Sequence, residues 1–163
     1  MFAENGEKVF MHVYWFQDSK IGHLNQVQAL LDELSKENEL AITKIQCPER
    51  SILNWLKSFL PSAPIENQKD GVTLLIGAGH SAYPQILKTQ QTLKKTANLL
   101  SVAILKPSFN ANAFDLVCAP EHDYPSTKKP NNVHAFKGSL AATSLIEPTP
   151  NKGIIGLGGL SKH

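Results

Sequence analysis

The chain has 163 residues, of which 42% are hydrophobic and 18% are charged, and its formal net charge is +2. These values are typical of one globular domain with its own core and exclude a disordered chain. The basic residues are scattered, whereas strong phosphate binding needs a patch or stripe of Lys and Arg, so nucleic acid is not an expected partner. No apolar run approaches the roughly 20 residues of a membrane span. The first residues also lack the pattern of a signal peptide, and the two distant cysteines, Cys47 and Cys118, are expected to be reduced thiols of a cytoplasmic protein.

Hydrophobic periodicity predicts strands and helices in alternation. Residues 9–16 are β-branched, aromatic and nearly continuous in apolar character, as in a central parallel strand. At 22–36 the apolar residues recur at helical spacing. The later elements expected are strands at 40–45, 72–76, 99–105, 114–118 and 133–136, and helices at 51–60 and 81–95. This order predicts an α/β domain with a doubly wound, mostly parallel, Rossmann-like sheet.

The turn after the first predicted strand carries the densest set of polar side chains. It lies at the carboxyl edge of the expected sheet, where open α/β proteins bind ligands. Histidine changes charge near neutral pH, so His23 is a candidate catalytic base, and Asp18 is a candidate to orient it. The candidate ligand-binding residues of this turn are Lys20, Gly22, Asn25 and Gln26. The structural alternative is that Asp18 and Ser19 cap the helix and His23 only packs.

Two further turns at strand ends are weaker candidates. Gly77, Gly79 and Ser81 follow the strand at 72–76, where they could contact a ligand or only form a tight turn. Glu121, His122 and Asp123 follow the strand at 114–118 and could face a ligand or solvent. A metal site is not expected, because no further ligands stand at a recognisable spacing. No cofactor is expected either, since the first turn has one glycine where a dinucleotide fold has several.

The last residues read as a boundary. Residues 148–151 resemble a linker, and 153–159 read as an apolar strand that enters a glycine turn. The sequence therefore predicts one domain at 1–147, with 148–163 as the linker and first strand of a truncated second domain. Self-association through a face that such a domain would cover is left open.

Three of these turns together resemble the elongated-mitochondria family, which contains plant mitochondrial fission factors and bacterial proteins labelled nucleoside-diphosphate-sugar epimerases. The family shows Asp-x-Lys-x-Gly-His-x-Asn-Gln, found here at 18–26, and Pro-Glu-His-Asp, found here at 120–123. Its Gly-Gly-x-Ser-Lys-His-like turn is matched at 158–163. At 77–80, where the family usually shows Ser-Gly-Arg-Arg, the chain has Gly-Ala-Gly-His.

The resemblance implies a function, because the family is similar to two-domain glycosyltransferases of the GT-B type. In those enzymes the N-terminal Rossmann-like domain holds the acceptor and the C-terminal domain binds a nucleotide-sugar. It implies that this chain is the acceptor-side half of such an enzyme, inactive without its C-terminal half, with a sugar or nucleotide-sugar as its small-molecule ligand. The alternative is a non-catalytic binding or scaffold module related to the fission factors.

Overall fold

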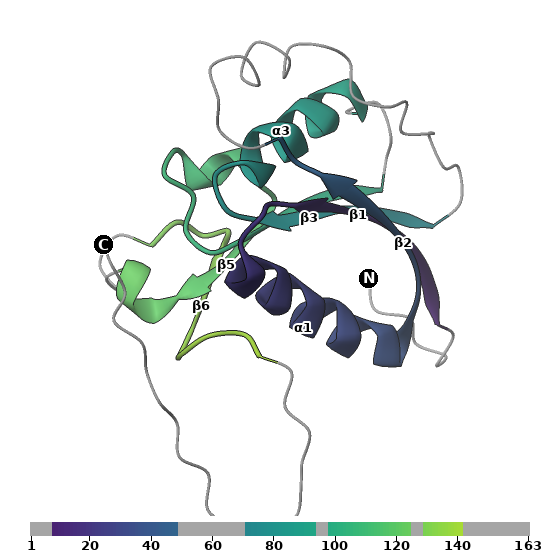
Figure 1. The fold of residues 1–163 in the computed structure, drawn as a ribbon, viewed down its shortest axis with the longest axis horizontal. Helices are drawn as coiled ribbons and strands as arrows, with labels where there is room; N and C mark the ends of the chain where they lie inside the picture. Colours follow the sequence, from purple (N-terminus) through teal and green to yellow (C-terminus); the bar gives the residue numbers. More distant parts are fainter. Residues whose placement is uncertain (1–7, 49–70, 94–97, 125–128, 142–163) are drawn as a thin grey trace, which may run out of the picture.

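A computed structural model describes residues 8–48, 71–93, 98–124 and 129–141 of the chain (Figure 1). These ranges contain six strands, two α-helices and two short 3-10 helices. In chain order they are β1 (Val9–Gln17), α1 (Ile21–Glu37), β2 (Asn38–Gln46), β3 (Val72–Ala78), α3 (Ala82–Leu93), β4 (Leu99–Ile104), η1 (Ala111–Ala113), β5 (Leu116–Pro120), η2 (Glu121–Asp123) and β6 (Val133–Phe136).

The six strands form one sheet in the order β2-β1-β3-β4-β5-β6, and every neighbouring pair is parallel. The predicted doubly wound, Rossmann-like α/β fold is confirmed. From β1 the chain goes to β2 at one edge, and β3 then pairs with the other side of β1. The strand order therefore reverses between β1 and β3, and open sheets of this kind bind ligands at the carboxyl ends of the strands at such a switch point.

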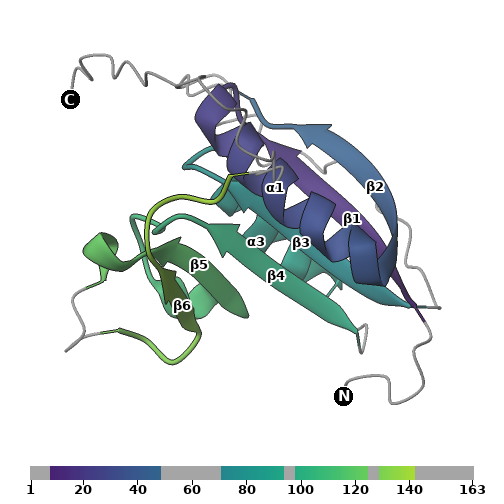
Figure 2. The same cartoon turned by 90° about the horizontal axis from the view of Figure 1, so that it is seen from below.

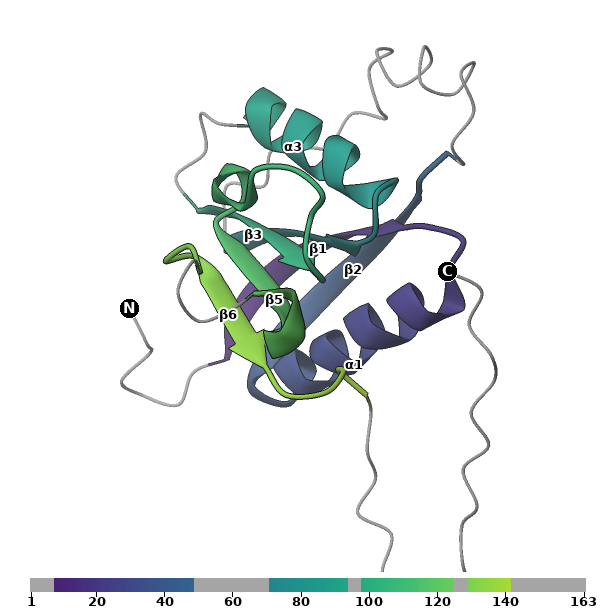
Figure 3. The same cartoon turned by 90° about the vertical axis from the view of Figure 1, so that its left-hand side faces the viewer.

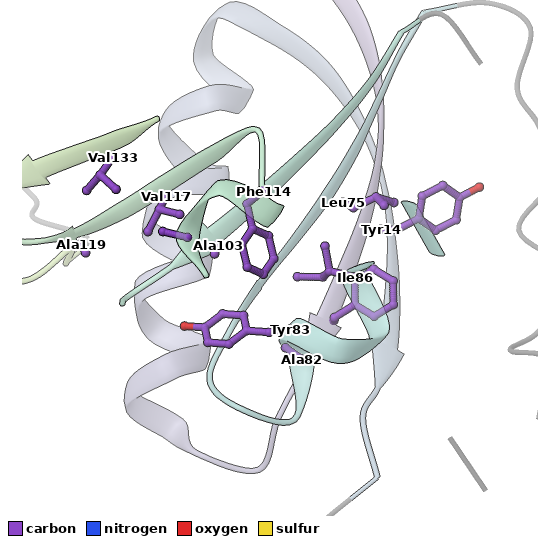
Figure 4. Close-up of a cluster of buried hydrophobic side chains, with 12 residues drawn as sticks. Tyr14, Leu75, Ala82, Tyr83, Ile86, Ala103, Phe114, Val117, Ala119 and Val133 are labelled. Carbon is purple, nitrogen blue, oxygen red and sulfur yellow. The ribbon is translucent and has the colours of Figure 1, made fainter. Parts of the chain in front are cut away.

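The two helices cover opposite faces of the sheet, as the turned views show (Figures 2 and 3). Side chains alternate between the faces along each strand. Val13 and Trp15 of β1 pack with Val27 and Leu31 of α1 in one buried cluster. In the other cluster, Tyr14 and Phe16 of the same strand pack with α3 residues and with side chains of the later strands (Figure 4). Each face of β1 is thus buried, which explains its nearly continuous apolar sequence.

The predicted element positions differ from the structure by only a few residues at their ends. The fifth strand differs most from its predicted position, since it was predicted at 114–118 and β5 begins at Leu116. Phe114 instead follows η1 and packs in the α3-side cluster. The predicted helix at 51–60 and the predicted linker and strand at 148–163 lie outside the described residues. No helix within the described ranges is long and apolar enough to cross a membrane.

Candidate functional site

Asp18 and His23 form a close pair at the carboxyl end of β1. The His23 Nδ1 and Asp18 Oδ2 atoms lie 2.6 Å apart. The Asp18 side chain is 7% exposed and that of His23 is 19% exposed, so the carboxylate is buried and the imidazole reaches solvent. A carboxylate can only accept hydrogen bonds, so it fixes the imidazole tautomer with the proton on Nδ1. The Nε2 atom of neutral His23 is then the one free to accept a proton.

The start of α1 explains why Asp18 is held in place. Lys20 is the N-cap residue, and its side chain makes no capping hydrogen bond. Its backbone N–H instead donates to Asp18 Oδ1 at 3.1 Å. The two carboxylate oxygens of Asp18 therefore have different partners, one in the backbone and one in the imidazole. His23 in turn lies in the first turn of the helix, where its backbone N–H donates to the Lys20 carbonyl at 3.0 Å.

Gly79 brings the turn after β3 against this pair. Its φ is +91°, a conformation that residues with a Cβ rarely adopt. A Cβ atom at this position would lie 2.5 Å from His23 Nδ1 and would also overlap Asp18 Oδ2. The backbone of the second glycine turn therefore packs directly on the Asp18–His23 pair, at the switch point between β1 and β3.

The Tyr83 phenol lies between the turns after β3, β4 and β5. It is 1% exposed, and its hydroxyl donates to the Ile104 carbonyl at the end of β4, at 2.7 Å. Burial raises the pKa of Tyr83 to about 12, against the effect of a hydrogen bond with the Gly79 backbone, while the negative charges of Asp18 and Asp123 also raise it. The carboxylates of the turns after β1 and β5 thus both raise the pKa of this one hydroxyl.

The predicted turn after β5 forms the short helix η2 and is more open to solvent. The His122 side chain is 79% exposed and that of Asp123 is 32% exposed, with 3.7 Å between His122 Nε2 and Asp123 Oδ1. Glu121 is exposed as well. Lys106, just beyond β4, donates from Nζ to the Asp123 carbonyl at 2.7 Å. The β4 and β5 ends are therefore joined at this edge of the sheet.

The other predicted site residues fall into two groups. Lys20, Gly22 and Asn25 are exposed around the start of α1, where a ligand could reach them. Gln26 donates from Nε2 to the Gly22 carbonyl at 3.4 Å, while its buried Oε1 accepts no hydrogen bond from any described residue. The second group lies around α3. Gly77 is buried, with Phe16 and Ala82 too close for a Cβ, and Ser81 is half-buried directly before the helix.

Sequence reasoning missed Tyr83 and Cys47 as neighbours of the site. Burial raises the pKa of the Cys47 thiol to about 12, with a further upward contribution from the Asp18 charge. The signal for Cys47 was available, because β2 runs parallel to β1 and Cys47 follows the end of β2 as Asp18 follows the end of β1. Tyr83 had no such signal, since it reads as an ordinary buried residue of an amphipathic helix.

The chemistry of these groups suits hydrogen bonding and proton transfer. Across the described ranges, no group of three or more His, Cys, Asp and Glu side chains is arranged to hold a metal ion. Cys47 and Cys118 are both free cysteines. The carboxyl edge of the sheet therefore carries an imidazole that is oriented by a carboxylate and lies beside glycine backbone and exposed polar side chains.

Comparison with protein-family models matches residues 21–147 to the family described as Mitochondrial fission ELM1. Comparisons with curated proteins and with solved structures gave no match. The matched stretch covers more than half of the chain and includes His23 and the turn after β5. Asp18 and Lys20 stand directly before it. The chain belongs to the Mitochondrial fission ELM1 family.

Proposed function

We propose that this chain is the acceptor-side half of a GT-B-like glycosyltransferase, and that His23 is the base that takes the proton of an acceptor hydroxyl. The observation that carries the proposal is the 2.6 Å contact between His23 Nδ1 and Asp18 Oδ2 at the β1/β3 switch point. A buried carboxylate behind a solvent-reaching imidazole is the arrangement that general-base catalysis needs.

The proposed step balances with a nucleotide-sugar as the second substrate. The acceptor O–H gives its proton to His23 Nε2 while the acceptor oxygen bonds to the anomeric carbon of the donor sugar. The bond from that carbon to the diphosphate oxygen breaks, and the nucleoside diphosphate leaves. Asp18 stabilises the imidazolium that forms. General-base catalysis of this kind contributes about 10²–10⁴-fold to a rate.

The surrounding residues support acceptor binding in this proposal. Lys20 and Asn25 are exposed beside the pair and would hydrogen-bond to sugar hydroxyls. Outside its own turn of helix, Gly22 has no described residue within 4 Å of the place where a Cβ would be, so the backbone there is open to close approach. Glu121 and His122 would line the far side of the acceptor site. A GT-B-like partner domain would hold the nucleotide-sugar.

The test is glycosyl transfer by the intact protein purified from its source cells, with labelled uridine-diphosphate hexoses and a panel of glycoside acceptors. His23→Ala should lower the transfer rate by about 10²–10⁴-fold. His134→Ala is the matched control, because His134 is an exposed residue of β6 and lies outside the candidate site. An intact protein that binds no nucleotide-sugar, with a His23→Ala rate equal to that of the control, would contradict the proposal.

A second candidate function is a non-catalytic binding module that recruits a partner protein. The observation that favours it is the family itself, whose description is mitochondrial fission. This function places the partner on a surface away from the strand ends. A pull-down of the partner that is unaffected by substitutions at Asp18, Lys20 and His23 would support it over the transferase.

A further inference from the structure

One buried residue, Tyr83, connects the two halves of the candidate site. The Tyr83 Oη atom lies 2.7 Å from the Ile104 carbonyl oxygen and 3.1 Å from the Leu105 carbonyl oxygen, both at the end of β4. The backbone N–H of Tyr83 donates to the Gly79 carbonyl in the turn after β3, at 3.3 Å. Tyr83 thus ties the β3–α3 turn, through its backbone N–H, to the chain that leaves β4, through its hydroxyl.

On one side of this link, the backbone of Gly79 determines the space left for the Asp18–His23 pair. The glycine is buried, and there is no room for a Cβ between it and the two side chains. A displacement of the Gly79 backbone would therefore change the position of the His23 imidazole. Because interiors are close-packed, such displacements are passed on and not absorbed.

On the other side, the link holds an unusual backbone conformation. Leu105 has a φ of +72°, which a leucine rarely adopts. Its N–H donates to the Cys118 carbonyl at 2.8 Å, so β5 and Tyr83 hold this residue from two directions. Directly after this turn, Lys106 reaches the Asp123 carbonyl and lies 5.0 Å from the centroid of the Tyr124 ring. Strained backbone of this kind persists only where the surroundings fix it, and it often accompanies functional sites.

We infer that Tyr83 is a positioning residue, which fixes the Asp18–His23 pair relative to the Lys106–Asp123 contact through the backbones of Gly79 and Leu105. The inference rests on the proposed function in taking these groups as the ligand site. The coupling itself can be measured without a ligand. A packing role alone would need the ring, which contacts Phe109 and Phe114 edge-on, and would not need the hydroxyl.

The experiment compares Tyr83→Phe, which removes only the hydroxyl, with Ser101→Ala. Ser101 is also fully buried, and its hydroxyl donates a hydrogen bond to Asp115 just before β5. Ser101→Ala therefore also removes one buried hydroxyl, but away from the carboxyl edge of the sheet. The readouts are thermal unfolding and the imidazole NMR signals of His23 and His122, followed through a pH titration of the full 163-residue chain.

Both variants should be less stable than the parent, while only Tyr83→Phe should shift the imidazole signals of His23 and His122. A Tyr83→Phe protein that is destabilised but keeps both histidine signals, as Ser101→Ala does, would overturn the inference. So would a shift confined to one of the two histidines.

A second variant keeps the inference testable if Tyr83→Phe does not fold. Leu105→Gly relieves the positive φ and loosens the turn from the opposite side. Coupling through Tyr83 predicts that this change shifts the His23 signals as well as those of His122, and a response at His122 alone would overturn it. If the His23 and His122 signals respond together but the intact protein shows no transfer activity, the proposed function fails and this inference stands. If the intact protein is active but the two signals do not respond together, this inference fails and the proposed function stands.

Discussion

Gly79→Ala is the substitution that tests the candidate site most sharply through stability. The new methyl group would lie 2.5 Å from His23 Nδ1 and 2.8 Å from His23 Cε1, and would overlap the Asp18 carboxylate. The variant therefore has two costs. The positive φ costs an alanine about 1–2 kcal/mol. Displacement of the Asp18–His23 pair costs a hydrogen bond to a charged group, about 1.5–3 kcal/mol.

Gly138→Ala separates these two costs. Gly138 also has a positive φ, +81°, but, its chain neighbours apart, no described residue lies within 4 Å of the position of its Cβ. The Gly138→Ala variant should therefore lose only the stability that the positive φ costs an alanine, about 1–2 kcal/mol. For a chain of this size, 1 kcal/mol corresponds to roughly 2–4 °C in Tm.

Thermal unfolding followed by circular dichroism measures the difference. Gly138→Ala should lower Tm by about 2–8 °C, and Gly79→Ala, at about 2.5–5 kcal/mol in total, should lower it by about 5–20 °C. The His23 imidazole signals should change in Gly79→Ala and stay as in the parent in Gly138→Ala. Equal loss of Tm in the two variants, with an unchanged His23, would refute the packing of Gly79 on the pair.

Three further predictions concern other parts of the molecule. Gly22→Ala should raise the free energy of unfolding by about 0.4–1 kcal/mol in urea denaturation, because Gly22 lies inside α1 with open space around it; a destabilised variant would contradict this. Leu31→Ala should lower the free energy of unfolding by about 2–5 kcal/mol in the same assay, since Leu31 is 1% exposed between α1 and the sheet; a loss below 1 kcal/mol would show that this contact is wrong. The pKa of the Cys47 thiol is raised by burial from 9.0 to about 12, so its contribution to stability is complete below pH 9 and is lost as the pH rises toward 12. Iodoacetamide should therefore modify Cys47 slowly in the native protein at pH 8 and rapidly in urea, as mass spectrometry would detect, and rapid native modification would contradict the burial.

Much of the fold could be predicted because its signals are local. The strand β1 is buried on both faces and reads as a continuous apolar run, and α1 places Val27 and Leu31 at helical spacing on one stripe. The alternation of such segments is enough to predict a doubly wound sheet. The ends of β5 were harder to predict. Phe114 is an apolar residue that packs in the α3-side cluster, but it lies in the loop before β5 and does not belong to the strand.

The candidate site was predictable only in part. Asp18 and His23 are five residues apart, so their contact is local and their residue types indicate it. That Gly79 packs on them depends on β3 pairing with β1, which the sequence pattern does not specify. The role of Tyr83 depends on its backbone contacting the turn after β3 while its hydroxyl contacts the end of β4, and no spacing along the chain indicates that.

The most direct measurement for the central claim is an NMR titration of the chain with a panel of simple glycosides, observing the His23 imidazole. The parent protein should show saturable shifts of the His23 signals with at least one glycoside. Asp18→Asn can no longer hold the imidazole with a carboxylate, so it should weaken this binding, whereas His134→Ala should bind as the parent does. No saturable shift at His23 with any glycoside, or equal binding by Asp18→Asn and the parent, would contradict the claim that this pair is an acceptor site.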